Sequence, residues 1–207
     1  MLKIAIIDYE AGNIRNVYNA LLNSGVTPIV SDDRKDLLTS DAIVLPGVGA
    51  AKDTMQHLKN KKLIEPINEF VNSGKPFLGI CMGLQALFDY SFEGGGKQDC
   101  LGIIHGNVNK FDNSLVVPHM GWNTINIVKE SPLLNGITDN DYFYFVHSFY
   151  PDPIDKSVIL ATTKYGKEFA SIVEYKNIFA TQFHPEKSGN IGLKIYENFI
   201  NIVKNNK

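Results

Sequence analysis

One stretch, Lys75-Pro-Phe-Leu-Gly-Ile-Cys-Met-Gly-Leu-Gln85, decides the first interpretation of this chain. Its apolar run from Phe77 to Ile80 predicts a buried strand, and the amphipathic run Leu84–Phe88 predicts a helix. Cys81 would lie on the tight turn between them, with its sulfur pushed out of the chain beside the positive helix end, which favours a thiolate. The flanking glycines fit this turn, because a side chain there would obstruct the backbone or an approaching carbonyl. The pattern predicts a nucleophilic cysteine.

A thiolate nucleophile needs a base, and the segment Ile178-Phe-Ala-Thr-Gln-Phe-His-Pro-Glu186 offers one. It predicts a second apolar strand that ends at His184-Pro-Glu186. Side chains two residues apart share one side of an extended chain, so Glu186 can orient one imidazole nitrogen while the other faces the sulfur. Taken alone, Cys81 is more simply a small buried side chain, and His-x-Glu a local structural pair. Together the motifs favour catalysis, provided that the fold brings them into contact.

Composition sets the broad class. The chain has 207 residues, a net charge of -2, 20% charged and 44% hydrophobic residues, which predicts one domain spanning 1–207 and gives no basic excess for nucleic acid. Two cysteines cannot form a disulfide framework, and this favours a reducing compartment. The apolar start ends too early, at Asp8, for a signal peptide, and no stretch has the length of a membrane span. We therefore expect a soluble cytoplasmic protein, and assign no chemistry to Cys100.

The order of the expected elements indicates an α/β fold. Strands and helices alternate in the first part of the chain, which predicts an open, mostly parallel sheet with helices on both faces and ligands at the carboxyl ends of its strands. Further strands of this sheet are expected at Lys3–Ile7, Pro28–Val30 and Ala42–Leu45. Helices are expected at 14–22, Thr54–Lys59, Ile64–Asn72 and Ile191–Val203. Short strand-like runs then predict a smaller antiparallel layer in the same domain: Gly102–Phe111, Thr124–Val128, Tyr142–Phe149, Val158–Thr163 and Phe169–Tyr175.

Five segments together resemble the class I (triad) glutamine amidotransferase family, whose fold is flavodoxin-like. They are Pro46-Gly-Val-Gly-Ala50, Gly79-Ile-Cys-Met-Gly-Leu-Gln85, Pro118-His-Met-Gly-Trp-Asn123, Tyr144-Phe-Val-His-Ser148 and Phe183-His-Pro-Glu-Lys-Ser188. The cysteine and histidine motifs mark the whole class. The segment from Pro118 to Asn123 narrows the resemblance to the glutaminase subunits of imidazole glycerol phosphate synthases, over nearly the full chain.

The resemblance implies hydrolysis of L-glutamine to glutamate and ammonia through a thioester on a Cys81–His184–Glu186 triad, with no cofactor. The other implied roles belong to two groups of residues: oxyanion-hole N–H groups at Val48, Gly49 and Met82, and substrate contacts at Gly49, Gln85 and Ser148. The alternative for Pro-Gly-Val-Gly is a plain turn at the end of a strand. No metal is implied, since His57 and His119 are not spaced as metal ligands.

The resemblance also implies a partner. In this family the glutaminase forms a heterodimer with a (β/α)8-barrel cyclase subunit, which receives the ammonia through a channel and makes imidazole glycerol phosphate and an aminoimidazole carboxamide ribotide in histidine biosynthesis. The implied interface residues are Asn13, Trp122, Tyr144 and Lys187. Core packing is the alternative for Trp122. We expect weak glutaminase activity without the partner, because the glycines around Val48 allow a peptide flip that completes the oxyanion hole.

Three positions depart from the family pattern as we know it: Ala51 where an aromatic residue is usual, His105 where proline is common, and Phe149 in place of tyrosine. They leave open a related glutaminase that feeds ammonia to a sugar amidotransferase in surface-glycan biosynthesis. A non-enzymatic assembly subunit is a second alternative, against which the intact triad argues. A cysteine peptidase is a distant third, because the chain shows no separate domain for a substrate cleft.

Overall fold

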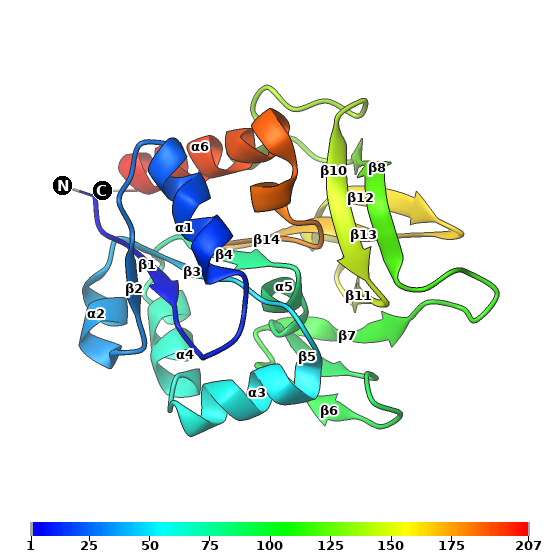
Figure 1. Ribbon diagram of the computed structural model, residues 1–207, viewed down its shortest axis with the longest axis horizontal. Helices are drawn as coiled ribbons and strands as arrows, with labels where there is room; N and C mark the ends of the chain where they lie inside the picture. Colours follow the sequence, from blue (N-terminus) through cyan, green and yellow to red (C-terminus); the bar gives the residue numbers. More distant parts are fainter. Residues whose placement is uncertain (1, 207) are drawn as a thin grey trace.

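The computed structural model describes residues 2–206, and its largest sheet has eight strands (Figure 1). Five of these strands run parallel, in the spatial order β2 (Ile29–Ser31), β1 (Ile4–Ile7), β3 (Ala42–Leu45), β4 (Phe77–Ile80) and β14 (Ile178–Thr181). The last four are buried along their whole length. Burial on both faces explains why their sequences are unbroken apolar runs instead of alternating ones. The predicted parallel sheet is confirmed.

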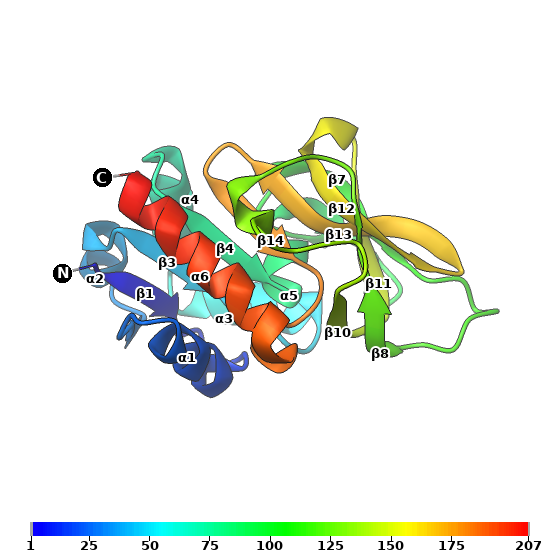
Figure 2. The same cartoon turned by 90° about the horizontal axis from the view of Figure 1, so that it is seen from above.

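Helices cover both faces of this parallel region, as Figures 1 and 2 show. On one face, α1 (Ile14–Asn23) and α6 (Gly189–Asn205) pack in a cluster with Ile4 and Ile6. The opposite face carries α2 (Arg34–Thr39), α3 (Ala51–Asn60) and α4 (Ile64–Asn72), whose apolar side chains pack with Ala5 and Ile7. Because successive strand residues point to opposite faces, β1 contributes to both apolar clusters.

The remaining strands are mainly antiparallel and extend the molecule beyond β14. The large sheet continues through β13 (Lys167–Tyr175), β12 (Ile159–Tyr165) and β9 (Asn126–Ile127). A four-stranded sheet has the order β11 (Phe149–Pro153), β7 (Ile104–Lys110), β5 (Phe88–Ser91) and β6 (Gln98–Asp99), and a hairpin-like pair joins β10 (Tyr142–His147) to β8 (His119–Thr124). The short 3-10 helices are η1 (Pro132–Leu134), η2 (Lys156–Val158) and η3 (Pro185–Lys187). The expected antiparallel layer is thus present, but the sequence did not indicate the strands β5, β6 and β8 or most of β11.

Two expectations about individual elements were wrong, and one short helix was missed. The helix after Cys81 is only the single turn α5 (Met82–Gln85), and the expected helical run Leu84–Phe88 leads into β5. Every residue of that run is buried, whereas a surface helix keeps a polar face. The strand expected over Tyr142–Phe149 is interrupted at Ser148. The short helix α2 was missed, although Asp33 caps it by accepting a hydrogen bond from the Asp36 N–H (3.0 Å).

The register of two neighbouring strands places the site. β4 and β14 are adjacent and parallel, and Ile80 pairs with Thr181 at their carboxyl ends. The Cys81 N–H continues the ladder by donating to the Thr181 carbonyl (2.7 Å). The residues that follow both strands therefore emerge side by side, as the sequence required for a meeting of its two motifs. No helix in residues 2–206 combines the length and apolar character that crossing a lipid bilayer requires.

Candidate active site

The backbone at Cys81 has the strained geometry of a nucleophile turn. Its φ is +54° and its ψ is -104°, in a region that non-glycine residues rarely adopt. Glycines let the turn pack this closely. A Cβ on Gly83 would run into the Leu45 carbonyl oxygen, one on Gly79 would lie 2.9 Å from the Gly83 oxygen, and one on Gly47 would lie 2.5 Å from the Gly83 nitrogen. The structure therefore confirms the prediction that side chains at the flanking glycines would obstruct the backbone of the turn.

The base and its orienting carboxylate follow β14. His184 precedes η3, and its Nδ1 lies 2.7 Å from Oε1 of Glu186, with both side chains at most 1% exposed. Asn13, at the start of α1, donates from Nδ2 to the same carboxylate oxygen (3.0 Å). The carboxylate is thus shared between the imidazole and a neutral amide, which fixes the tilt of the ring. The sequence did not predict this contact of Asn13.

The electrostatics join His184 to the cysteine. Nδ1 faces Glu186, so Nε2 is the nitrogen left for the sulfur; within residues 2–206 it forms no well-aligned hydrogen bond. Burial would lower the pKa of His184, but the charge of a Cys81 thiolate beside it, reinforced by the hydrogen bond to Glu186, raises this pKa to about 10. The helix end contributes little, because α5 has a single turn. The group placed to stabilise a Cys81 thiolate is therefore the His184 imidazolium rather than a helix dipole.

A pocket of about 220 Å³ opens beside the cysteine. Its walls contain Cys81 and His184 together with the predicted oxyanion and substrate residues Val48, Gly49, Met82, Gln85 and Ser148, and also residues that were not predicted, Glu93, Pro118, Val146, His147 and Phe149. A larger cavity, of about 780 Å³, lies near Pro76 and Asn177, at the opposite ends of β4 and β14, and holds none of these side chains. The smaller pocket is the candidate substrate site because it contains the reactive groups.

The two glycines around Val48 differ in their freedom. Gly47 is wedged against Met82 and Gly83, whereas nothing lies within 4 Å of a Cβ built on Gly49, whose φ is +88°. Val48 itself is partly exposed at the pocket. A rotation of the peptide between Val48 and Gly49 would therefore pivot at Gly49, with Gly47 as a fixed anchor.

Glu93 is the charged pocket residue that sequence reasoning missed. It follows β5, and its carboxylate accepts a hydrogen bond from the Ala51 N–H (2.6 Å). Burial raises the pKa of this carboxyl group, and the Ala51 N–H offsets part of that rise. Its sequence, Glu-Gly-Gly-Gly, is that of an ordinary loop, so only the fold shows that it faces the pocket. A carboxylate there suits the ammonium group of an amino-acid substrate.

Two buried histidines are hydrogen-bonded to each other: His147 lines the pocket, and His119 lies outside it. His147 Nδ1 lies 2.8 Å from the Phe149 carbonyl oxygen, which assigns the proton to Nδ1 because a carbonyl only accepts. The neutral ring then accepts at Nε2 from Nδ1 of His119 (3.0 Å), and His119 accepts at Nε2 from the Asn123 amide (3.2 Å). Burial lowers the pKa of His147 to about 3 and that of His119 to about 4. Both rings therefore stay neutral at physiological pH.

The Phe149 carbonyl connects His147 to a second pocket residue, Gln85. Gln85 donates from Nε2 to that oxygen (2.9 Å) and to Oε1 of Gln182 (3.0 Å). The Oε1 of Gln85 is buried and has no partner within the described chain. Gln85 is a lining residue of the pocket, and an unpaired acceptor of this kind is satisfied when a donor binds next to it.

The predicted interface residues lie close to one another. Trp122 is 56% exposed on β8, which excludes the core-packing alternative, and Met120 on the same strand is 63% exposed. The Trp122 ring contacts Tyr144 edge-on, with 6.1 Å between centroids, and Lys187 places its Nζ 5.8 Å from the Tyr144 ring centroid. Trp122 and Lys187 are exposed, and the half-buried Tyr144 contacts both, so the three residues form an exposed patch at η3. Asn13 is hydrogen-bonded to Glu186, the residue before Lys187.

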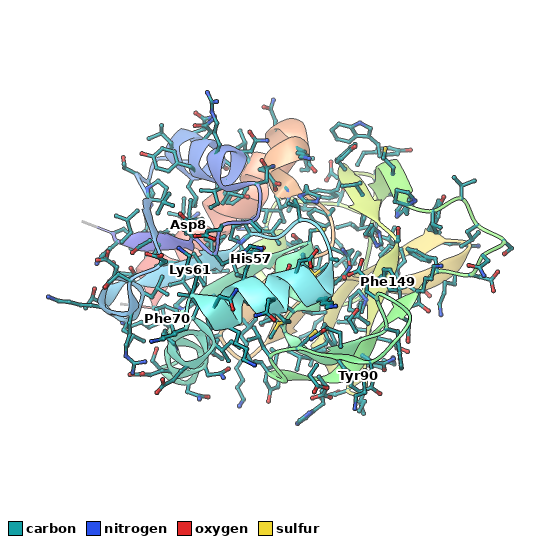
Figure 3. The ribbon with its side chains drawn as sticks, turned by 60° about the horizontal axis from the view of Figure 1, so that its bottom comes forward. Asp8, His57, Lys61, Phe70, Tyr90 and Phe149 are labelled. Carbon is teal, nitrogen blue, oxygen red and sulfur yellow. The ribbon has the colours of Figure 1, made fainter. Side chains whose placement is uncertain are left out.

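The remaining candidates stand apart from the pocket. His57, on α3, faces Glu10 at 4.0 Å next to Lys61, away from Phe149 (Figure 3). His119 is buried among aromatic rings. No cluster of three metal-ligating side chains occurs in the part of the chain that the structure describes. His105, one of the departures from the family pattern, is exposed on β7 beside Asp89.

The comparison with known families decides the classification. The model of the family described as "Glutamine amidotransferase class-I" matches residues 5–202. The chain belongs to this family. The cysteine turn and the histidine strand, on which the sequence resemblance rested, both lie within the matched residues, and the fold brings them together.

Individual relatives and solved structures are also similar to this glutamine amidotransferase. It is similar to "Imidazole glycerol phosphate synthase subunit HisH" of Methanocaldococcus jannaschii, with 50% identity over 97% of this chain and 100% of the relative. The protein of the same name from Dehalococcoides mccartyi is 47% identical over 99% of each chain. Among solved structures, "Crystal structure of glutamine amidotransferase" has a TM-score of 0.76 and 17% identity over 97% of this chain and 98% of that one. "Structure of PurLQS from Thermotoga maritima" has a TM-score of 0.75, 22% identity and the same coverage. These two structures support the fold.

Proposed function

We propose that this chain is the glutaminase subunit of an imidazole glycerol phosphate synthase. The observation that carries the proposal is the convergence of Cys81 and His184 at one pocket, at the ends of adjacent parallel strands, with the buried Glu186 side chain paired to His184. The relatives named as HisH subunits of that synthase, similar over nearly the full chain, support the choice of client. A cytoplasmic location suits the chemistry, because Cys81 must remain a free thiol.

The first half of the reaction forms a thioester. The Cys81 sulfur attacks the side-chain amide carbon of glutamine, a C–S bond forms, and the carbonyl oxygen becomes an oxyanion. The Met82 N–H has no acceptor inside α5, because it belongs to the first residue of that helix, and it is one oxyanion donor. The peptide between Val48 and Gly49 supplies the other after rotation at Gly49. His184 gives its Nε2 proton to the departing nitrogen as the C–N bond breaks, and ammonia leaves.

The second half releases glutamate. His184, now neutral, takes a proton from a water molecule that attacks the thioester carbonyl. The C–S bond breaks, the sulfur leaves as a thiolate, and the imidazolium–thiolate pair is restored. Throughout, Glu186 holds the Nδ1 proton and the ring orientation. We assign the substrate ammonium to Glu93 and one substrate N–H to Oε1 of Gln85.

The proposed partner is a (β/α)8-barrel cyclase subunit that receives the ammonia. The exposed patch of Trp122, Tyr144 and Lys187 is the proposed docking surface, because an exposed aromatic group with a neighbouring cation is typical of interface centres. Lys187 follows Glu186 directly, so a partner seated there would adjoin the triad.

The test is glutaminase turnover of the purified chain alone, with the cyclase subunit, and with the cyclase and its ligand. We expect little activity alone and a large increase in the complete mixture. Equal turnover in all three would refute partner-dependent activation. Growth of a histidine auxotroph that carries this chain distinguishes the histidine pathway from a surface-glycan client, because a glycan-pathway glutaminase would not restore growth.

A further inference from the structure

Gln182 places a fully buried side-chain amide directly against the nucleophile. Its Nε2 lies 3.7 Å from the Cys81 sulfur, and the residue is 0% exposed. The position follows from the register: Thr181 pairs with Ile80, so the next residue of each strand lies beside the other. The Gln182 backbone N–H donates to the Ser171 carbonyl (2.8 Å), which holds the residue at the end of β14.

The hydrogen-bond network fixes which end of this amide faces the sulfur. An amide nitrogen has two protons, and Gln85 uses both: one for the Phe149 carbonyl (2.9 Å) and one for Oε1 of Gln182 (3.0 Å). If the Gln182 amide were flipped, its N–H groups would face those of Gln85, and no hydrogen bond could form between them. The oxygen of Gln182 must therefore face Gln85, and its N–H donor must face Cys81.

We propose that Gln182 is a further catalytic residue of the glutaminase reaction, donating an amide hydrogen bond that stabilises the Cys81 thiolate and aims it into the pocket. The inference rests on the proposed function and adds a residue to it. The thiol proton goes to Nε2 of His184, while Gln182 keeps both of its amide protons. Gln85 acts as a positioning residue, because its Nε2 donates to Oε1 of Gln182.

Such a donor has a defined part in the cycle. The thiolate is present before attack and again when the thioester is cleaved, and a hydrogen bond to a charged acceptor is stronger than one to a neutral acceptor. The bond is therefore strongest in the states where sulfur carries charge. Other titratable groups lie near this sulfur: His184 and the buried Tyr9 phenol interact with it, and Glu93 and His147 line the same pocket. The test must change Gln182 alone.

The first measurement is the pH dependence of Cys81 alkylation by iodoacetamide. Gln182→Met keeps the length of the side chain and removes the donor. We expect its alkylation midpoint to rise by about one pH unit, and kcat for glutamine to fall about tenfold with KM changed less than about twofold. Gln182→Glu, which offers an acceptor to the thiolate, should shift the midpoint further. Gln56→Met, the same substitution on the exposed face of α3, should leave all of these values unchanged.

Background labelling is corrected with Cys81→Ser, which retains Cys100. Burial raises the pKa of the Cys100 thiol to about 12, so this background is small. A folded Gln182→Met protein with the parent's midpoint and kcat would overturn the proposal. A purely structural role would lower stability without moving the midpoint.

A second measurement uses the unsubstituted protein and does not depend on whether the variants fold. In isotope-labelled protein, the side-chain amide signals of Gln182 should move with the same midpoint as Cys81 alkylation, and should stay constant in Cys81→Ser. Gln182 amide signals that do not change as the Cys81 thiol titrates would also overturn the proposal. The alkylation midpoint and the amide signals do not require glutamine turnover. An unsubstituted protein that shows no glutaminase activity even with the cyclase and its ligand would therefore refute the proposed function separately.

Discussion

The buried pair His119–His147 makes the stability of this fold sensitive to mild acid. Both rings are neutral in the folded protein, because burial lowers their pKa values from 6.5 to about 4 and about 3. In the unfolded chain both would protonate near 6.5. Their contribution to stability is therefore fully present above that value, and it is lost as the pH falls through the interval from 6.5 toward 3.

The magnitude follows from the difference in bound protons. Between about pH 7 and about pH 5, each ring contributes a loss of about 2 kcal/mol, or about 4 kcal/mol for the pair. His184 acts in the opposite direction, because its folded pKa is raised to about 10 and its contribution is fully present below 6.5. Protonated His184 therefore adds about 1 kcal/mol to the free energy of unfolding as the pH falls over the same interval. The net loss of about 3 kcal/mol is a large part of the stability of an ordinary domain.

Urea unfolding at these two pH values measures the effect. We expect the free energy of unfolding to be about 3 kcal/mol lower at the acidic pH, with an unchanged denaturant slope. His105→Asn removes a histidine that is 78% exposed and serves as the control, with the same acid loss as the parent. Imidazole NMR signals should show His119 and His147 neutral at the lower pH. A stability equal within about 1 kcal/mol at both values, or rings that titrate near 6.5, would refute the reasoning.

Three further predictions concern the site. Glu186→Gln should lower kcat by roughly a hundredfold or more, because the His184 imidazolium loses the carboxylate that pairs with it. In steady-state assays KM for glutamine should change little. Gly83→Ala should lower the free energy of unfolding by about 2 kcal/mol or more, because the new Cβ meets backbone, whereas Gly96→Ala, in open space, should be nearly neutral; equal unfolding midpoints would contradict this. Glu93→Gln should raise KM for glutamine about tenfold with a smaller change in kcat, since an amide holds the substrate ammonium less well than a carboxylate; an unchanged KM would remove Glu93 from substrate binding.

Much of the fold could be predicted, because burial leaves a clear record in the sequence. β1, β3, β4 and β14 are fully buried and appear as uniform apolar runs. β8 left no such record: most of its residues are at least partly exposed, and Trp122 and Met120 point outward. The helix after Cys81 was predicted too long, because tertiary packing buries its whole apolar run and directs the chain into β5.

The site shows the same division between local and non-local information. Cys81, His184 and Glu186 lie in short motifs whose chemistry can be recognised residue by residue. Asn13, Glu93 and the amide of Gln182 reach the pocket or the triad from ordinary-looking segments. Their partners are remote in sequence, so only the register of β4 and β14 and the packing of the loops around them show the contact.

The most direct test of the account is to trap the covalent intermediate. The glutaminase, with its cyclase partner, is mixed with isotope-labelled glutamine, quenched in acid during turnover, and digested for mass spectrometry. We expect a γ-glutamyl group on the peptide that contains Cys81, and none in Cys81→Ser. Sustained glutamine hydrolysis by a protein that never carries the label on Cys81 would contradict the central claim.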